Sequence, residues 1–96
     1  MVTISKPANA GTMESNDIIF NIEPSENGEI EIDLDSVVYY QFGDQIKNVI
    51  KTTLQEQGID SLIIRAFDRG ALDITIKCRL LTALERAGYE IKEEDL

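Results

Sequence analysis

The feature that most constrains this chain is a perfect alternation of acidic and apolar residues over residues 29–34. Successive side chains of a β-strand point to opposite faces of a sheet, so the pattern predicts a strand with one face in water and the other against a core. Residues 17–23 alternate in a similar way. Residues 24–28 between them contain a proline and an Asn-Gly pair, which are typical of turns. The sequence therefore predicts a β-hairpin with a loop of about five residues.

The apolar period changes from Ser36 onward, and either Asp35 or Ser36 is a candidate helix N-cap. Gly58 lies where a left-handed C-cap is expected. Gly43 falls inside this predicted helix, and a close packing contact would account for it. The residues at helical spacing are Val38, Phe42, Ile46, Val49, Ile50 and Leu54.

Residues 61–67 are apolar on both faces and predict a third, central strand. Residues 71–78 fit either a strand or the first turns of a helix; we favour a helix from about Ala71 that ends at Gly88. The predicted fold is a small two-layer α+β domain in the order β-β-α-β-α, with helices covering the sheet. We expect a mobile, irregular N-terminal arm over 1–16, the domain over 17–88 and an acidic tail over 89–96.

The charge balance limits the possible partners. Eighteen acidic and nine basic residues give a net charge of −9, which disfavours nucleic acids and anionic membranes and suits basic protein surfaces. No apolar run is long enough for a membrane span or a signal peptide, so we expect a cytoplasmic protein.

Few residues are candidates for chemistry. The chain has no histidine, so it lacks the commonest general base, and a metal site would need carboxylates alone. The acids of residues 29–33 fit a solvated strand face, and the single cysteine, Cys78, fits a packed structural role. We expect no catalytic residue and no metal site.

Ser15 stands in a polar segment before the first predicted strand, where it is either a plain loop residue or an accessible acceptor hydroxyl. The segment Lys6–Asp17, KPANAGTMESND, resembles the N-terminal signature of citrate lyase acyl carrier proteins, the gamma subunits. Two further segments resemble the same family: Gln41–Ile46, and Asp68–Asp73 with the following Lys77–Leu80. The three segments occur in the family's order and span almost the whole chain.

The resemblance implies that Ser15 carries 2′-(5″-phosphoribosyl)-3′-dephospho-coenzyme A, which recombinant protein made without the attachment enzyme would lack. It also implies a non-catalytic carrier that presents acetyl and citryl thioesters to the alpha (transferase) and beta (lyase) subunits during cleavage of citrate to acetate and oxaloacetate. The alternatives are the acyl carrier subunit of malonate decarboxylase and an unmodified acidic adaptor domain. The stoichiometry of the complex does not follow from the sequence.

Overall fold

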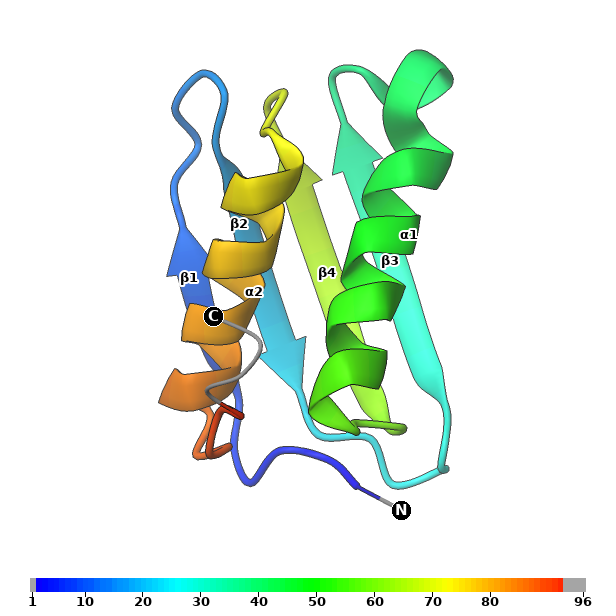
Figure 1. Ribbon diagram of the computed structural model, residues 1–96, viewed down its shortest axis with the longest axis vertical. Helices are drawn as coiled ribbons and strands as arrows, with labels where there is room; N and C mark the ends of the chain where they lie inside the picture. The colour runs from blue at the N-terminus through cyan, green and yellow to red at the C-terminus, as the bar shows by residue number, and fades with distance from the viewer. Residues whose placement is uncertain (1, 93–96) are drawn as a thin grey trace.

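A computed structural model describes residues 2–92 and shows a four-stranded sheet with both helices packed on one face (Figure 1). The predicted two-layer α+β fold is confirmed, with one more strand than expected. The elements are β1 (Ala8–Gly11), β2 (Ile18–Glu23), β3 (Ile30–Ser36), α1 (Tyr39–Gln57), β4 (Leu62–Asp68) and α2 (Asp73–Arg86).

The strands lie in the order β1-β2-β4-β3, so β4 is central as its apolar sequence predicted. It pairs antiparallel with β2 and parallel with β3. The parallel pairing follows from α1, which carries the chain back to the end of the sheet at which β3 begins. Strand β4 therefore starts beside the start of β3. Leu62, Ile64 and Ala66 of β4 are buried beneath the helices, beside Phe20 of β2.

The predicted hairpin between residues 17–23 and 29–34 is wrong, because β4 lies between β2 and β3. Residues 24–29 instead pass across the start of β4. The Ser61 hydroxyl donates to the Ser25 carbonyl oxygen at 2.7 Å, and the Leu62 N–H donates to the Glu29 carbonyl oxygen at 3.0 Å. The turn residues are genuine local signals, but they do not determine which strand lies beside β2.

The prediction that residues 1–16 are irregular is wrong for Ala8–Gly11, which pairs with β2 as strand β1. Ile4 and Ala10 are buried in the core, so this segment belongs to the domain. The predicted boundary at residue 16 falls inside the connection between β1 and β2. Four small residues carry no hydrophobic alternation, which is why the strand has no signal of its own.

Helix α1 confirms the predicted C-cap, because Gly58 has the left-handed φ of 76°. It also confirms the predicted packing contact at Gly43, where a Cβ would lie 3.2 Å from the Tyr39 ring. The predicted N-cap is wrong, since α1 begins at Tyr39 after Val38 without a side-chain cap. The Ser36 hydroxyl accepts a hydrogen bond from the Val38 N–H at 3.1 Å.

Helix α2 resolves the ambiguity of residues 71–78 in favour of the helix. Beyond it, Tyr89 and Ile91 pack against the core, and the Lys92 N–H donates to the Gln57 side chain at 3.0 Å. Residues 89–92 of the predicted acidic tail are therefore packed against the domain. Residues 93–96 of that tail lie outside the described residues.

Candidate functional site

Ser15 lies in the connection between β1 and β2, at the end of the sheet where both helices begin (Figure 1). Glu14, Ser15, Asn16 and Asp17 form a tight turn, closed by a 3.1 Å hydrogen bond from the Asp17 N–H to the Glu14 carbonyl oxygen. Asn16 has a φ of 66°, which this residue type tolerates better than most. The Ser15 side chain is exposed, and within residues 2–92 its hydroxyl has no hydrogen-bond partner.

Asp17 anchors the base of this turn, and it is only 8% exposed. Its carboxylate accepts two hydrogen bonds from the Arg79 guanidinium, at 3.0 and 2.8 Å. It also accepts one from the Thr12 hydroxyl at 2.6 Å and one from the Ile18 N–H at 2.7 Å. The hydrogen bonds from Arg79 are the main reason that the pKa of Asp17 falls from 3.8 to about 2, against the opposing effect of burial.

Backbone contacts tie the same turn to the loop that precedes α2. The Asn16 N–H donates to the Arg69 carbonyl oxygen at 2.8 Å, and the Arg69 N–H donates to the Asp17 carbonyl oxygen at 2.9 Å. On the other side, Gly11 has a φ of 103°, and a Cβ there would lie 1.8 Å from the Ile18 carbonyl oxygen. The flanks of the turn are thus fixed while the Ser15 hydroxyl stays free.

Asp68, a second buried acid, organises the neighbouring loops. Its carboxylate accepts hydrogen bonds from the Ser36 hydroxyl at 2.8 Å and from the N–H groups of Gly70 and Ala71 at 3.0 and 2.9 Å. The Val37 N–H donates to the Asp68 carbonyl oxygen at 3.2 Å. This one residue connects the end of β3, the end of β4 and the loop before α2, next to the Ser15 turn.

The site offers an acceptor hydroxyl that is not hydrogen-bonded to any base within residues 2–92. Arg79, the cation bound at the base of the turn, is engaged by Asp17, and the described residues contain no cluster of acids and cysteine suited to a metal ion. The other candidate hydroxyl, that of Thr12, is half-buried and occupied, because it donates to Asp17 and accepts from the Glu14 N–H at 3.2 Å. Ser15 is therefore the more available acceptor for a modifying enzyme.

The remaining candidates from the sequence lie away from this turn. The acids Glu29, Glu31 and Asp33 are exposed, as expected for a solvated strand face. Cys78 is also exposed, so the prediction of a packed structural cysteine is wrong. Its neighbour Lys77 forms an ion pair with Glu56 at 3.7 Å, and this contact brings no base to the Cys78 thiol.

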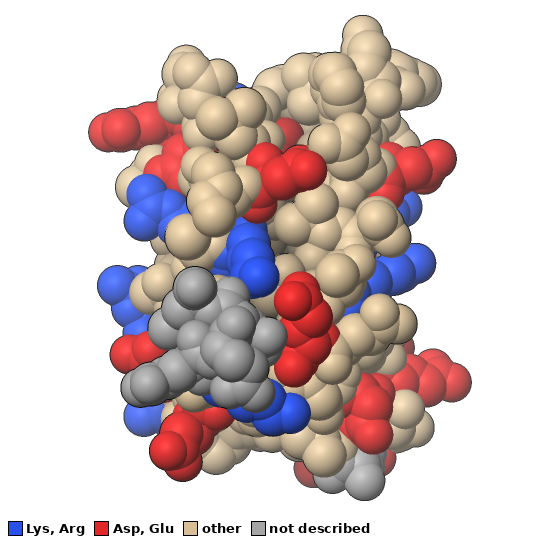
Figure 2. Space-filling model, viewed as in Figure 1, with Lys and Arg blue, Asp and Glu red and all other residues tan. Residues whose placement is uncertain are grey.

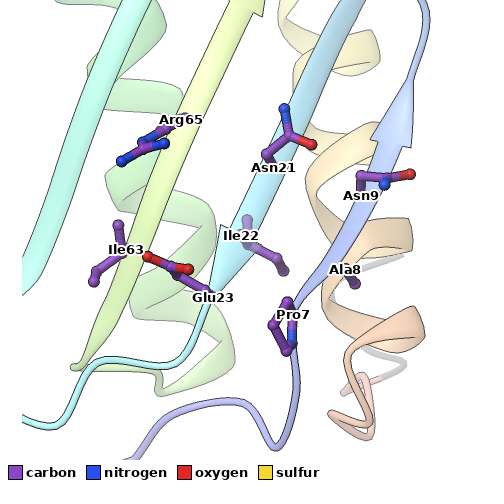
Figure 3. A pocket seen from close by; sticks show the side chains of 8 residues that line it. All are labelled: Pro7, Ala8, Asn9, Asn21, Ile22, Glu23, Ile63 and Arg65. Carbon is purple, nitrogen blue, oxygen red and sulfur yellow. The ribbon is translucent and has the colours of Figure 1, made fainter.

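A shallow depression of about 260 Å³ lies on the open face of the sheet (Figure 3). Asn9, Asn21, Glu23 and Arg65 project from three adjacent strands into it, away from both helices. The depression begins near the start of β1, whereas the Ser15 turn follows the end of β1. It is therefore separate from the candidate attachment site.

Comparison with known proteins gives consistent matches over nearly the whole chain. A curated citrate lyase acyl carrier protein from Halothermothrix orenii is 52% identical over 94% of this chain and 95% of its own length. One from Lactiplantibacillus plantarum is 54% identical over 88% of this chain and 86% of its own. The chain belongs to the citrate lyase acyl carrier protein family. The family model for the malonate decarboxylase delta subunit also matches residues 5–87, so the two groups of carriers are related.

A solved structure shows that this chain shares its fold with a chain of a different protein. The structure is described as a Pseudomonas malonate decarboxylase hetero-tetramer in complex with malonate. The TM-score is 0.78, with 90% of this chain and 88% of that chain covered at 22% identity. No helix among residues 2–92 of this family member has the length and apolar character of a membrane-spanning segment.

The sequence pointed to Ser15 through the family resemblance, but the Asp17–Arg79 pair was missed. The two residues are 62 positions apart, and no periodicity connects them. Their only signal was that both lie in segments that resemble the family, Lys6–Asp17 and Lys77–Leu80. The hydrogen-bonding role of Asp68 was likewise missed, although Asp68 begins the segment Asp68–Asp73 that resembles the family.

Proposed function

We propose that this chain is the acyl carrier subunit of citrate lyase and that Ser15 is its attachment residue. The proposed group is 2′-(5″-phosphoribosyl)-3′-dephospho-coenzyme A, joined through a phosphodiester bond to the Ser15 hydroxyl. When bound, this group would supply the thiol that carries acetyl and citryl units as thioesters. The observation that carries the proposal is the exposed, unpartnered Ser15 hydroxyl on a turn whose base is fixed by Asp17 and Arg79.

The residues of the chain fit this group in a simple way. The free hydroxyl can enter the active site of an attachment enzyme without first breaking an internal hydrogen bond. The fixed base keeps the attachment point on one end of the domain, so the tethered group samples a limited volume around it. A tether of this kind raises the effective concentration of the group at a partner's active site. The chain's own contribution is thus binding and positioning, and we propose that it catalyses neither chemical step.

The proposed partners are the alpha and beta subunits of citrate lyase and the enzyme that attaches the group. Relatives named as citrate lyase acyl carrier proteins support the complex, and we propose that it is cytoplasmic. A second candidate function, acyl carrier subunit of malonate decarboxylase, is favoured by the match of residues 5–87 to that family model.

The test is citrate cleavage by a complex assembled from the alpha and beta subunits with this chain purified from a host that has the attachment enzyme. We expect the wild type to support cleavage of citrate and not decarboxylation of malonate, and Ser15→Ala to support neither. Thr52→Ala is the matched control, because Thr52 is an exposed hydroxyl on α1. Malonate decarboxylation with the corresponding subunits, and no citrate cleavage, would select the second candidate.

An unmodified acidic adaptor is distinguished by the same preparations. If wild-type protein from the native host had only the mass of its polypeptide and still joined the complex, the carrier function would be wrong. Equal citrate cleavage by Ser15→Ala and wild type would contradict the attachment residue.

A further inference from the structure

Exposed apolar side chains gather at the end of the molecule that carries Ser15. Of the nine large apolar side chains that are exposed within residues 2–92, eight belong to segments at this end, and only Val2 lies at the opposite end. We call six of them the apolar end: Met13, Val37, Tyr40, Phe42, Leu72 and Ile74. Figure 2 shows that the surface over the start of α1 is largely free of charged side chains. Contiguous exposed apolar surface of this kind is typical of interaction sites.

A groove of about 550 Å³ runs between the first turns of α1 and α2. Phe42 and Ile46 form one wall, and Leu72 and Ile74 form the other. The Gln45 side chain donates across it to the Asp73 carboxylate at 3.0 Å. The helical period predicted a buried Phe42, yet this ring is 50% exposed. The groove therefore leaves apolar surface exposed between the two helices.

The groove is continuous with the Ser15 turn. Gly70 forms one end of the groove, and a Cβ on Gly70 would lie 3.6 Å from the Asn16 side-chain oxygen. Asn16 also donates its N–H to the Arg69 carbonyl oxygen at 2.8 Å. Anything that receives a group attached to Ser15 must approach this end of the domain and meet the apolar end.

We propose that the apolar end is the surface through which the chain docks on the larger subunits of its complex. The inference rests on the proposed function, because it takes the direction of approach from the attachment residue. The occupant is a protein surface, since Tyr40 is 101% exposed and lies with Val37 and Met13 outside the groove, where a tethered arm lying in the groove would leave them uncovered. Aromatic and large aliphatic side chains of this kind are common interface anchors.

The charges around the apolar end indicate the chemistry of the partner. Three exposed acids lie close to it, Asp44 on α1, Asp73 at the start of α2 and Glu14 in the Ser15 turn, and one exposed base, Arg69, lies beside Gly70. The partner surface is therefore an apolar patch with basic side chains around its rim. Such an arrangement would speed association by long-range attraction and would be screened by salt.

The test measures binding of the unloaded chain to the purified alpha and beta subunits by calorimetry, so that it does not depend on attachment to Ser15. We expect Leu72→Ser and Phe42→Ser each to weaken binding at least about tenfold, as is typical when a buried interface anchor is truncated. Leu72 is 70% exposed in the free domain, so the thermal unfolding of the Leu72→Ser variant should stay close to that of the wild type. Val2→Ser, an exposed apolar residue at the opposite end, is the matched control and should bind like the wild type.

Equal affinities for Leu72→Ser, Phe42→Ser and the wild type would overturn the inference and leave the proposed function intact. So would an unloaded wild type that does not bind either subunit. If these variants bound normally and loading of Ser15 shifted the amide resonances of Phe42 and Leu72 in the isolated chain, the groove would hold the tethered group instead of a partner protein. Failure of the proposed function would be detected separately, because wild-type protein purified from the native host would then have only the mass of its polypeptide.

Discussion

Ser15 and Ser25 lie in the two loops that flank β2, and their side chains have opposite environments. Ser25, between β2 and β3, is only 3% exposed. Its hydroxyl donates to the Asn27 side-chain oxygen at 2.6 Å, and its carbonyl oxygen accepts from the Ser61 hydroxyl at 2.7 Å. Ser15, between β1 and β2, is exposed, and its hydroxyl has no partner within the described residues.

The comparison shows that exposure of Ser15 does not come from a loose loop. The residues on either side of it are held in place, Gly11 by its close approach to the Ile18 carbonyl oxygen and Asp17 by its hydrogen bonds from Arg79. In the loop between β2 and β3, Ser25 itself is one of the residues that hold the loop in place. A carrier needs the first arrangement, in which the anchor is firm and the acceptor atom is free. The following predictions test this contrast, from the largest expected effect to the smallest.

Gly11→Ala should destabilise the domain by about 3 kcal/mol or more, because its backbone is left-handed and the new Cβ would meet the Ile18 carbonyl oxygen. Gly28→Ala, in the loop that carries Ser25, is the matched control. Gly28 is also left-handed, with a φ of 75°, but it is exposed, so we expect a cost of about 1 kcal/mol. Urea unfolding of both variants gives the comparison. Equal losses in the free energy of unfolding for the two variants would mean that the base of the Ser15 turn is less constrained than the structure shows.

Arg79→Gln should lower the free energy of unfolding at pH 7 by about 2 kcal/mol, because Asp17 loses both guanidinium hydrogen bonds. Arg65→Gln, on the open face of the sheet, is the control and should change it by less than about 0.5 kcal/mol. Urea unfolding again measures the difference. A change below about 0.5 kcal/mol for Arg79→Gln would show that the pair does not anchor the turn.

The same pair predicts a pH dependence. The pKa of Asp17 in the folded domain, about 2, lies below its ordinary value of 3.8, so the carboxylate stabilises the fold above about pH 4. This contribution, about 2 kcal/mol, is lost as the pH falls from about 4 to about 2. Arg79→Gln should lose less stability than the wild type over that interval, and parallel profiles for the two proteins would exclude this origin.

Ser25→Ala should cost about 1 kcal/mol, because it removes a buried hydroxyl with a hydrogen-bond partner. Ser15→Ala should stay within about 0.5 kcal/mol of the wild type, as an exposed substitution without lost contacts. Thermal unfolding of the two unloaded variants, side by side, measures the contrast directly. A larger loss of stability for Ser15→Ala than for Ser25→Ala would contradict the contrast between the two loops.

The expected motion of the N-terminal segment is the smallest effect. The sequence predicted mobility over residues 1–16, and we now propose that it is confined to the tip of the turn, Met13 to Ser15, because Ile4 and Ala10 are buried. Backbone order parameters should be lower at Ser15 than at Ala10. Equal values would show a rigid tip, and low values throughout 2–11 would restore the mobile arm.

Much of the fold followed from local pattern, and the errors have one physical origin. The buried face of β2, the central place of β4 and the C-cap at Gly58 were predicted because each depends on nearby residues. The pairing of β2 with β4 depends on contacts between residues 40 to 50 positions apart, which no turn signal encodes. Strand β1 exists because β2 offers it a partner, since its four small residues would not form a strand alone.

The site shows the same division. Ser15 was predicted from the family resemblance, and the chemistry of a lone exposed hydroxyl could not have selected it from the residues alone. The anchor beneath it joins Asp17 to a helix residue 62 positions away, and Asp68 receives its hydrogen bonds from two separate segments, the end of β3 and the loop before α2. Such long-range polar contacts become visible only when the fold brings their members together.

The most direct test of the central claim is the mass of the chain purified from its native host, compared for Ser15→Ala and Thr12→Val. Thr12 carries the other hydroxyl of this turn, already occupied by Asp17 and Glu14. We predict that Thr12→Val gains the mass of the phosphoribosyl-dephospho-coenzyme A group, that fragmentation places it on Ser15, and that Ser15→Ala has only the mass of its polypeptide. A loaded Ser15→Ala protein, or a group placed on Thr12 in the wild type, would contradict the account.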